Sequence, residues 1–183
     1  GGTLYTDTAG GTTNLRLGIT AGDSIADGAL YNTLVGSEAG TAITLGDYNV
    51  AVGGKALDAD TLGNRSVAIG HGALSAQNFT GVTDAYNTAV GTLAGTAVTT
   101  GLYNTLIGGN AGPALTDADE NVVVGVAALN SDTLGSRSVA IGYAALNVQN
   151  FTTATLSYNT AVGNRAGTAV TTGVNNTLIG GLA

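Results

Sequence analysis

Asn-Thr-Ala-Val-Gly at residues 87–91 is one of nine copies of a five-residue fragment that decides the fold of this chain. Each copy has Asn or Ser, then Thr or Val, an apolar residue, Val or Ile, and Gly, with Ala three residues after the Gly. The copies lie at residues 32–36, 49–53, 66–70, 87–91, 104–108, 121–125, 138–142, 159–163 and 176–180. One short strand repeated at nearly constant spacing stacks on itself, so the pattern predicts a solenoid.

The spacing of the copies has a second, longer period. Successive terminal glycines lie 17 residues apart, except for two steps of 21 that end at Gly91 and Gly163. Four consecutive steps make a unit of 72 residues, which occurs twice and is followed by one further rung. A degenerate tenth copy, with Arg at its centre, lies at residues 14–18. We expect a capping segment with this degenerate rung at residues 1–30 and the repeat domain at residues 31–183.

Side chains alternate in direction along each copy, which shows which positions share a face of the strand. Positions 2 and 4 of a strand point to one side, and positions 1, 3 and 5 point to the other. Positions 2 and 4 are always Thr, Val or Ile, and position 3 is always Leu, Ala or Val, so both faces are apolar. A coil buries one face against its own opposite wall, and the other face then needs a neighbouring chain. We therefore expect an oligomer, a homotrimer whose coils are either intertwined or side by side.

The remaining positions of each rung are small or polar. Position 1 is Asn in seven copies and Ser in two, and the stacked side chains are expected to form a polar ladder between rungs. A second short strand is expected in segments such as 42–44 and 97–99, before a glycine closes the rung. The expected fold class is all-β: a parallel β-roll or β-solenoid of about ten rungs with two short strands each.

Composition argues against several classes of function. The chain has 183 residues, 30 glycines, no Cys, five basic residues in total and a net charge of −7. Nucleic-acid binding needs clustered cations, and a membrane span needs a longer apolar stretch than any present. The single histidine, His71, is interpreted as a surface residue, and no nucleophile lies beside a base. We therefore expect no enzyme, no cofactor, no metal, no nucleic-acid partner and no insertion into a membrane.

Acidic residues gather in turns of the repeat. The stretches 58–60 and 117–120 place alternate carboxylates in a turn, an arrangement that can ligate calcium. The ordered glycine and the multi-oxygen spacing of known calcium loops are absent, so exposed salt bridges are the simpler expectation. The expected pairs are Asp60 with Arg65 and Asp132 with Arg137.

The two 21-residue rungs hold the candidate binding residues. Each contains one of the two Phe residues of the chain, preceded by Asn. Loops that protrude from a rigid scaffold commonly bind, and aromatic residues with amides make glycan and protein contacts. The other interpretation is that each Phe folds back and fills the longer rung. Together with the Tyr before the next strand, the candidate receptor-binding residues are Asn78, Phe79, Tyr86, Asn150, Phe151 and Tyr158.

Two further side-chain rows follow the repeat. Tyr precedes the strand at residues 31, 48, 86, 103 and 158. These side chains either form an exposed stripe or pack in the turns with their hydroxyls in water. Thr at position 2 recurs at residues 33, 88, 105, 160 and 177, a pattern that suggests ice binding. Thr alternates with Val there, and its face is expected to be buried, which argues against that function.

Fragments of the repeat resemble those of two families of trimeric proteins. Arg-Ser-Val-Ala-Ile-Gly at residues 65–70 and 137–142 resembles the head repeat of trimeric autotransporter adhesins, a left-handed β-roll that binds host matrix or cells. The Asn-Thr-Ala-Val-Gly form followed by Gly-x-x-Ala-Gly is similar to repeats in bacteriophage tail and virion fibres. The long rungs and the 72-residue unit favour the fibre. Neither family has catalytic residues to carry over.

The resemblance implies a non-enzymatic structural or attachment segment of a bacteriophage fibre, located in the virion. Such a rod either holds a receptor-binding tip away from the particle or binds a host cell-surface glycan or protein itself. The alternative is the head of a bacterial trimeric adhesin at the bacterial cell surface. The sequence begins without Met, and we expect it to be a piece of a longer chain.

Overall fold

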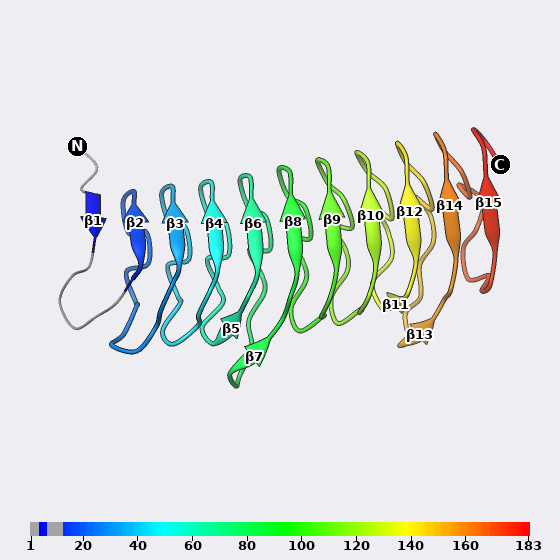
Figure 1. The fold of residues 1–183 in the computed structure, drawn as a ribbon. Helices are drawn as coiled ribbons and strands as arrows, with labels where there is room; N and C mark the ends of the chain where they lie inside the picture. Colours follow the sequence, from blue (N-terminus) through cyan, green and yellow to red (C-terminus); the bar gives the residue numbers. More distant parts are fainter. Residues whose placement is uncertain (1–3, 7–12) are drawn as a thin grey trace.

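The chain forms a parallel β-solenoid, seen in a computed structural model that describes residues 4–6 and 13–183 (Figure 1). No helix occurs in these residues, and the predicted all-β solenoid fold is confirmed. Within them, eleven strands form the main sheet in chain order. They are β1 (Leu4–Thr6), β2 (Leu15–Leu17), β3 (Thr33–Val35), β4 (Val50–Val52), β6 (Val67–Ile69), β8 (Thr88–Val90), β9 (Thr105–Ile107), β10 (Val122–Val124), β12 (Val139–Ile141), β14 (Thr160–Val162) and β15 (Thr177–Ile179).

The register places equivalent residues of successive copies side by side. In the pairing of β8 with β9, for instance, Ala89 lies opposite Leu106. The degenerate copy forms β2 and pairs in the same register, so Arg16 lies opposite Leu34. All these pairings are parallel except that of β1 with β2, which is antiparallel. Each position of the repeat therefore becomes a straight row of side chains along the rod. Part of the expected capping segment, residues 1–3 and 7–12, lies outside the described residues.

The interior of the coil is narrow and is filled in two alternative ways. In some rungs the fourth residue after the terminal Gly is itself Gly, and an apolar residue follows three positions later, as in Gly40 and Ile43. A Cβ atom on Gly40 would lie 2.8 Å from the side chains of both Ile43 and Leu34, so the small residue makes room for them. In the other rungs Leu takes that place, as Leu57 does, and the apolar residue is replaced by a polar one, here Asp60. The interior therefore keeps a nearly constant volume from rung to rung.

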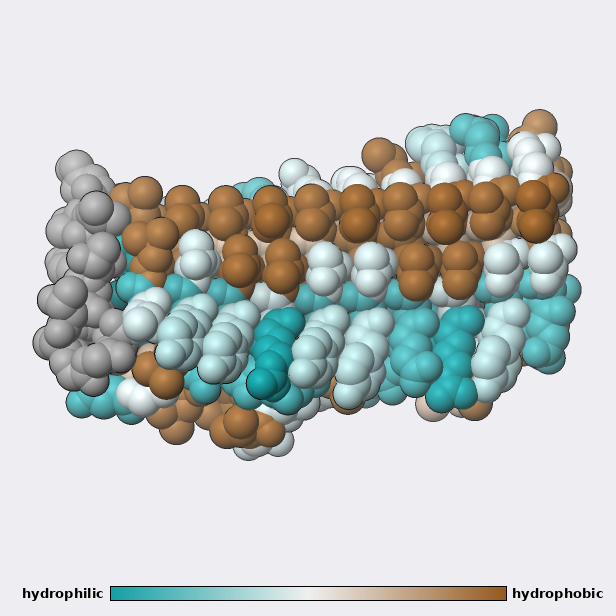
Figure 2. All heavy atoms as spheres, in the orientation of Figure 1, coloured by the Kyte–Doolittle hydropathy of each residue, from teal (hydrophilic) through white to brown (hydrophobic). Residues whose placement is uncertain are grey.

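Position 3 of each strand points into this interior, and positions 2 and 4 point outward. Leu34, Ala89 and Leu106 are fully buried, whereas the outward Ile69 and Ile107 are each 38% exposed. Figure 2 shows the outward side chains as two parallel rows along the rod, which we call the β-branched stripe. The stripe consists of the residues at positions 2 and 4 of the nine copies. These are the first and last residues of β3, β4, β6, β8, β9, β10, β12, β14 and β15. The single coil encloses only the position-3 face, so burial of the Thr row depends on a neighbouring chain and stays a prediction.

The second half of the rung differs from the expectation of a strand in each rung. In the described residues such strands are confined to the two longer rungs and the rungs before them, where they form two small parallel sheets. They are β5 (Gly63–Asn64) paired with β7 (Thr83–Asp84), and β11 (Gly135–Ser136) paired with β13 (Thr155–Leu156). Segments 42–44 and 97–99 are turns and bends instead, although Ala42 N–H still donates to Asp58 O of the next rung at 3.1 Å. Left-handed residues before these segments, such as Glu38 with φ of 61°, prevent a continuous extended ladder.

Candidate functional site

The candidate functional site is a surface rather than a cavity. Residues 4–6 and 13–183 contain no pocket and no group of three His, Cys, Asp or Glu placed to hold a metal ion. In the same residues no helix has the length and apolar character needed to cross a bilayer. The features that could recognise a partner are therefore the protruding longer rungs, the rows of side chains beside the strands and the β-branched stripe.

The two aspartates that were expected to form exposed salt bridges are buried, so that expectation is wrong. Asp60 and Asp132 are fully buried. Gln77 Nε2 donates to Asp60 Oδ2 at 2.6 Å, and Gly63 N–H donates to Asp60 Oδ1 at 3.0 Å. Burial raises the pKa of the Asp60 carboxyl, and these hydrogen bonds oppose that shift. Asp132 accepts a hydrogen bond from Gln149 in the same way, at 2.6 Å.

The arginines pair with acidic residues on the outer surface instead. Arg65 forms an ion pair with Asp84. Arg137 donates to both carboxylate oxygens of Glu120, from Nε at 3.0 Å and from Nη2 at 3.2 Å. Exposed pairs of this kind each contribute less than about 1 kcal/mol to stability. The two aspartates cannot join them because their place in the rung points into the coil.

The Asn residues at position 1 form the polar ladder that the sequence predicts, and we call it the amide ladder. Asn104 is fully buried. Its Oδ1 accepts from Asn121 N–H at 3.0 Å, and its Nδ2 donates to Ala118 O at 2.8 Å. The amide thus ties each rung to the next and also ties the strand to the far turn of the coil.

The amide ladder continues through the two Ser positions by a device that sequence reasoning missed. The Ser66 side chain is too short to replace an amide, and Gln77 of the longer rung inserts beside it. Gln77 Nε2 donates to Ser66 Oγ at 2.9 Å, while Gln77 Oε1 accepts from Asn87 Nδ2 at 2.9 Å. Gln149 donates to Ser138 Oγ at the same distance in the second unit. The sequence signal is that Ser occurs only in the copy before each 21-residue step.

The longer rungs bury their Phe side chains, as the packing interpretation of these residues expects. Phe79 is 5% exposed and Phe151 is 6% exposed. Phe79 lies against Gly63, where a Cβ atom would come within 2.8 Å of its ring. The most exposed large apolar side chain of each longer rung is Val82 in the first, at 68%, and Leu156 in the second, at 51%. Sequence reasoning did not single out either residue.

The two candidate Asn residues are bound to the rung before them. Thr61 Oγ1 donates to Asn78 Oδ1 at 3.0 Å, and Thr133 Oγ1 donates to Asn150 Oδ1 at 3.2 Å. Asn78 is exposed, whereas Asn150 is half-buried. Each amide therefore helps to fix the start of the longer rung, and the Nδ2 group of Asn78 remains in an exposed position.

Tyr86 and Tyr158, the remaining candidates, belong to a row that runs the length of the rod beside the amide ladder. We call it the edge row; it contains the residue just before position 1 of each copy. Its members are Tyr31, Tyr48, Arg65, Tyr86, Tyr103, Glu120, Arg137, Tyr158 and Asn175. All nine have φ between 49° and 63°, a left-handed conformation that is uncommon for such side chains. Figure 2 shows this row of larger side chains below the β-branched stripe.

Neighbouring side chains of the edge row stack face to face. The ring centroids of Tyr31 and Tyr48 are 5.0 Å apart, and those of Tyr86 and Tyr103 are 5.8 Å apart. Arg65 lies between the two pairs, with Cζ at 5.5 Å from the ring centroids of both Tyr48 and Tyr86. The ring faces are therefore largely covered by neighbours, and the ring edges and hydroxyls remain for contact with a partner.

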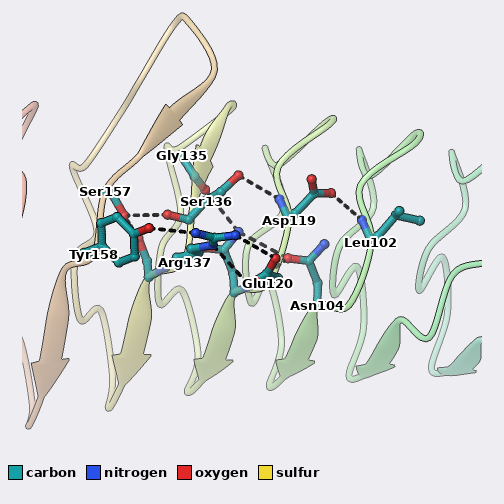
Figure 3. Close-up of polar contacts among 11 residues, drawn as sticks. Leu102, Asn104, Asp119, Glu120, Gly135, Ser136, Arg137, Ser157 and Tyr158 are labelled. Atoms are coloured by element: carbon teal, nitrogen blue, oxygen red, sulfur yellow. Dashed lines mark hydrogen bonds and ion pairs between the residues drawn. The ribbon is translucent and has the colours of Figure 1, made fainter.

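The later part of the edge row is held by charge instead of stacked rings (Figure 3). Besides its bonds to Glu120, Arg137 donates from Nη1 to the Tyr158 hydroxyl oxygen at 2.6 Å. Behind this contact, Ser136 Oγ accepts from Asp119 N–H at 2.9 Å and continues the rung-to-rung hydrogen bonding. Glu120, Arg137 and Tyr158, three side chains of the edge row, therefore form one connected polar group on the surface.

Comparisons with known proteins add no family to this description. No protein-family model matches the chain, and no curated protein and no solved structure shows significant similarity to it. The class that the fold defines is a parallel β-solenoid repeat protein, which is compatible with a β-roll repeat.

Proposed function

We propose that this chain is a rigid, non-enzymatic segment of a homotrimeric bacteriophage fibre, which presents or forms a surface that binds a host receptor. The observation that carries the proposal is the β-branched stripe, an apolar band on one side of the rod. Contiguous exposed apolar patches larger than a few hundred Å² usually mark interaction sites. The stripe follows every copy of the repeat, so its partner has to run along the whole rod.

A second and third copy of the same chain satisfy this requirement best. The stripe is straight because equivalent residues of successive strands pair in register. Identical straight stripes can close around an axis parallel to the rod, and closed symmetry leaves no stripe exposed. The number three comes from the resemblance of the fragments at 65–70 and 137–142 to trimeric β-roll repeats.

The receptor-binding part of the proposal rests on the two longer rungs. Val82 and Leu156 are exposed apolar residues of these rungs; Val82 directly precedes β7, and Leu156 is the last residue of β13. Figure 1 shows β7 and β13 extending from the same side of the rod, away from the main sheet. A partner at this edge would be a cell-surface glycan or protein that uses these residues together with Tyr86 and Tyr158. The runner-up setting, the head of a bacterial trimeric adhesin, uses the same surfaces and is favoured by the Arg-Ser-Val-Ala-Ile-Gly fragments.

Light scattering on the purified chain tests the assembly. We expect a mass three times that of the 17.8 kDa chain at micromolar concentration. Val90→Asp places a charge in the stripe and should yield monomer, because a charge buried between chains is strongly unfavourable. Val82→Asp, on the protruding edge, is the matched control and should remain a trimer. A wild-type monomer would refute the proposed assembly.

Binding is tested separately with the intact trimer. A glycan array and a panel of bacterial cells should each be probed with the wild type and with the double variant Val82→Asp/Leu156→Asp. Binding that the double variant loses supports recognition by the longer rungs. Binding that the double variant keeps, or a wild-type trimer that binds nothing, would overturn the receptor role of these rungs.

A further inference from the structure

The tyrosines of the edge row occur in two stacked pairs whose proximity has a chemical consequence of its own. We propose that Tyr31 with Tyr48, and Tyr86 with Tyr103, are sites of oxidative cross-linking that join neighbouring rungs through a dityrosine bond. The proposal does not depend on the function proposed above, because it concerns groups within one chain. The reagent it requires is a one-electron oxidant of the peroxidase class acting with hydrogen peroxide.

The geometry of the pairs suits radical coupling. Their rings are nearly parallel, with interplanar angles of 13° for Tyr31–Tyr48 and 12° for Tyr86–Tyr103. All four rings are about half exposed, between 48% and 53%, so an oxidant can reach them. Coupling requires the two side chains to turn from the stacked arrangement until two ortho carbons meet, and the half-exposed positions leave room for this on the solvent side. Two groups held this close react far faster than free groups at ordinary concentrations.

Among the tyrosines from residue 13 on, the surroundings restrict coupling within a chain to these two pairs. Arg65 separates Tyr48 from Tyr86, with its Cζ 5.5 Å from each ring centroid. Tyr143 and Tyr158 are exposed to a similar extent, at 49% and 47%. In the part of the chain from residue 13 on, their rings lie against Arg165 and Arg137 and not against tyrosine. These two residues are therefore internal controls: they are accessible to the oxidant but have no stacked tyrosine.

The proposed step balances in atoms and electrons. Each phenol of a pair gives one electron to the oxidised peroxidase and releases its hydroxyl proton, which yields two phenoxyl radicals. The radicals couple at their ortho carbons, and a carbon–carbon bond forms. The hydrogen on each of these carbons then moves to the phenoxyl oxygen, which restores both hydroxyls. Overall the pair loses two electrons and two protons, and one hydrogen peroxide is reduced to two waters.

The bond would close a loop between adjacent rungs of the solenoid. The members of each pair are 17 residues apart, which is one rung. Solenoids separate by loss of contacts between neighbouring rungs, so a covalent link at this spacing opposes that process directly. It also shortens the loops available to the unfolded chain, as a disulfide does. We therefore expect the oxidised rod to melt at a higher temperature than the untreated rod.

The experiment treats the folded full chain with horseradish-type peroxidase and hydrogen peroxide. Chymotrypsin cleaves after the leucines between the pair members, Leu34 and Leu93 among them, so mass spectrometry can identify each linked peptide. We expect both links, blue dityrosine fluorescence and unchanged single-chain mobility on a denaturing gel. Tyr48→Phe should abolish the first link alone, Tyr103→Phe the second alone, and Tyr158→Phe neither.

Three results would overturn the proposal. One is oxidation of Tyr158 or Tyr143 without either link. Another is formation of the same links at equal yield in chain unfolded by urea, which would show that the stack is not their cause. The third is a set of links that join only separate chains.

Discussion

Removing one rung of the amide ladder in the middle of the rod should destabilise the protein strongly, and Asn104→Ala is the change to make. Asn104 is fully buried, and its side-chain amide bonds to the rung on either side: to Asn87 before it, and to Ala118 and Asn121 after it. Alanine would leave the Asn121 N–H without the acceptor at 3.0 Å and the Ala118 carbonyl without the donor at 2.8 Å. Each buried group that loses its partner costs about 1–3 kcal/mol, so we expect a loss of roughly 4 kcal/mol.

The matched control is the same substitution in the last rung, Asn176→Ala. Asn176 is only half-buried, and it donates to Asn159 Oδ1 from its backbone N–H and its Nδ2, both at 2.9 Å. The alanine variant keeps the backbone bond, and water reaches the groups that lose the side chain, so we expect a cost of less than about 1 kcal/mol.

Urea unfolding followed by circular dichroism measures both variants. The protein concentration must be the same throughout, because assembly of chains changes the apparent stability. Equal and small losses for Asn104→Ala and Asn176→Ala would refute the reasoning, since they would show that the buried amides do not hold the rungs together.

Three further changes test other parts of the structure. Burial raises the pKa of the Asp60 carboxyl above its value in the unfolded chain, so the folded state binds this proton more readily. The stability of the wild type relative to Asp60→Asn should therefore increase as the pH falls, and this gain should be lost as the pH rises through the folded-state pKa. Melting temperatures of both proteins, measured against pH, test this. Gly53→Ala would put a Cβ atom 2.7 Å from the next rung's backbone at φ of 132° and should cost several kcal/mol, whereas Gly81→Ala meets nothing within 4 Å and should be nearly neutral in thermal unfolding. Phe79→Ala should cost about 3–5 kcal/mol in denaturant unfolding because it empties the longer rung, and a loss below 1 kcal/mol would contradict its role as a plug.

The strands, their register and their two faces could be predicted from the sequence because they depend on positions within one copy. Alternation of side chains over five residues is a local property, and the constant spacing then fixes which residues meet. The buried Asn side chains of the amide ladder followed from the same reasoning. So did the outward rows, which one coil leaves open and whose burial by a neighbouring chain stays a prediction.

The partners of the charged side chains could not be predicted, because they depend on how each turn is shaped. Asp60 lies five residues from Arg65 in sequence, yet one points into the coil and the other stacks between two tyrosines of the edge row. Left-handed conformations at residues other than glycine produce these directions, and composition gives no sign of them. Gln77 could replace the missing amide at Ser66 only because the longer rung brings it there, a contact between residues 11 apart.

The central claim is that copies of this chain cover the β-branched stripe around a common axis, and a cysteine placed on the stripe tests it most directly. The chain has no native Cys, so Ile107→Cys introduces a single thiol at a stripe position that is 38% exposed. In the proposed trimer the stripes face the threefold axis, where identical residues of the three chains meet, so mild oxidation should link chains in pairs through this thiol. Val148→Cys, at a position off the stripe with the same exposure, should give no such link. Equal and low cross-linking of the two variants would contradict the account.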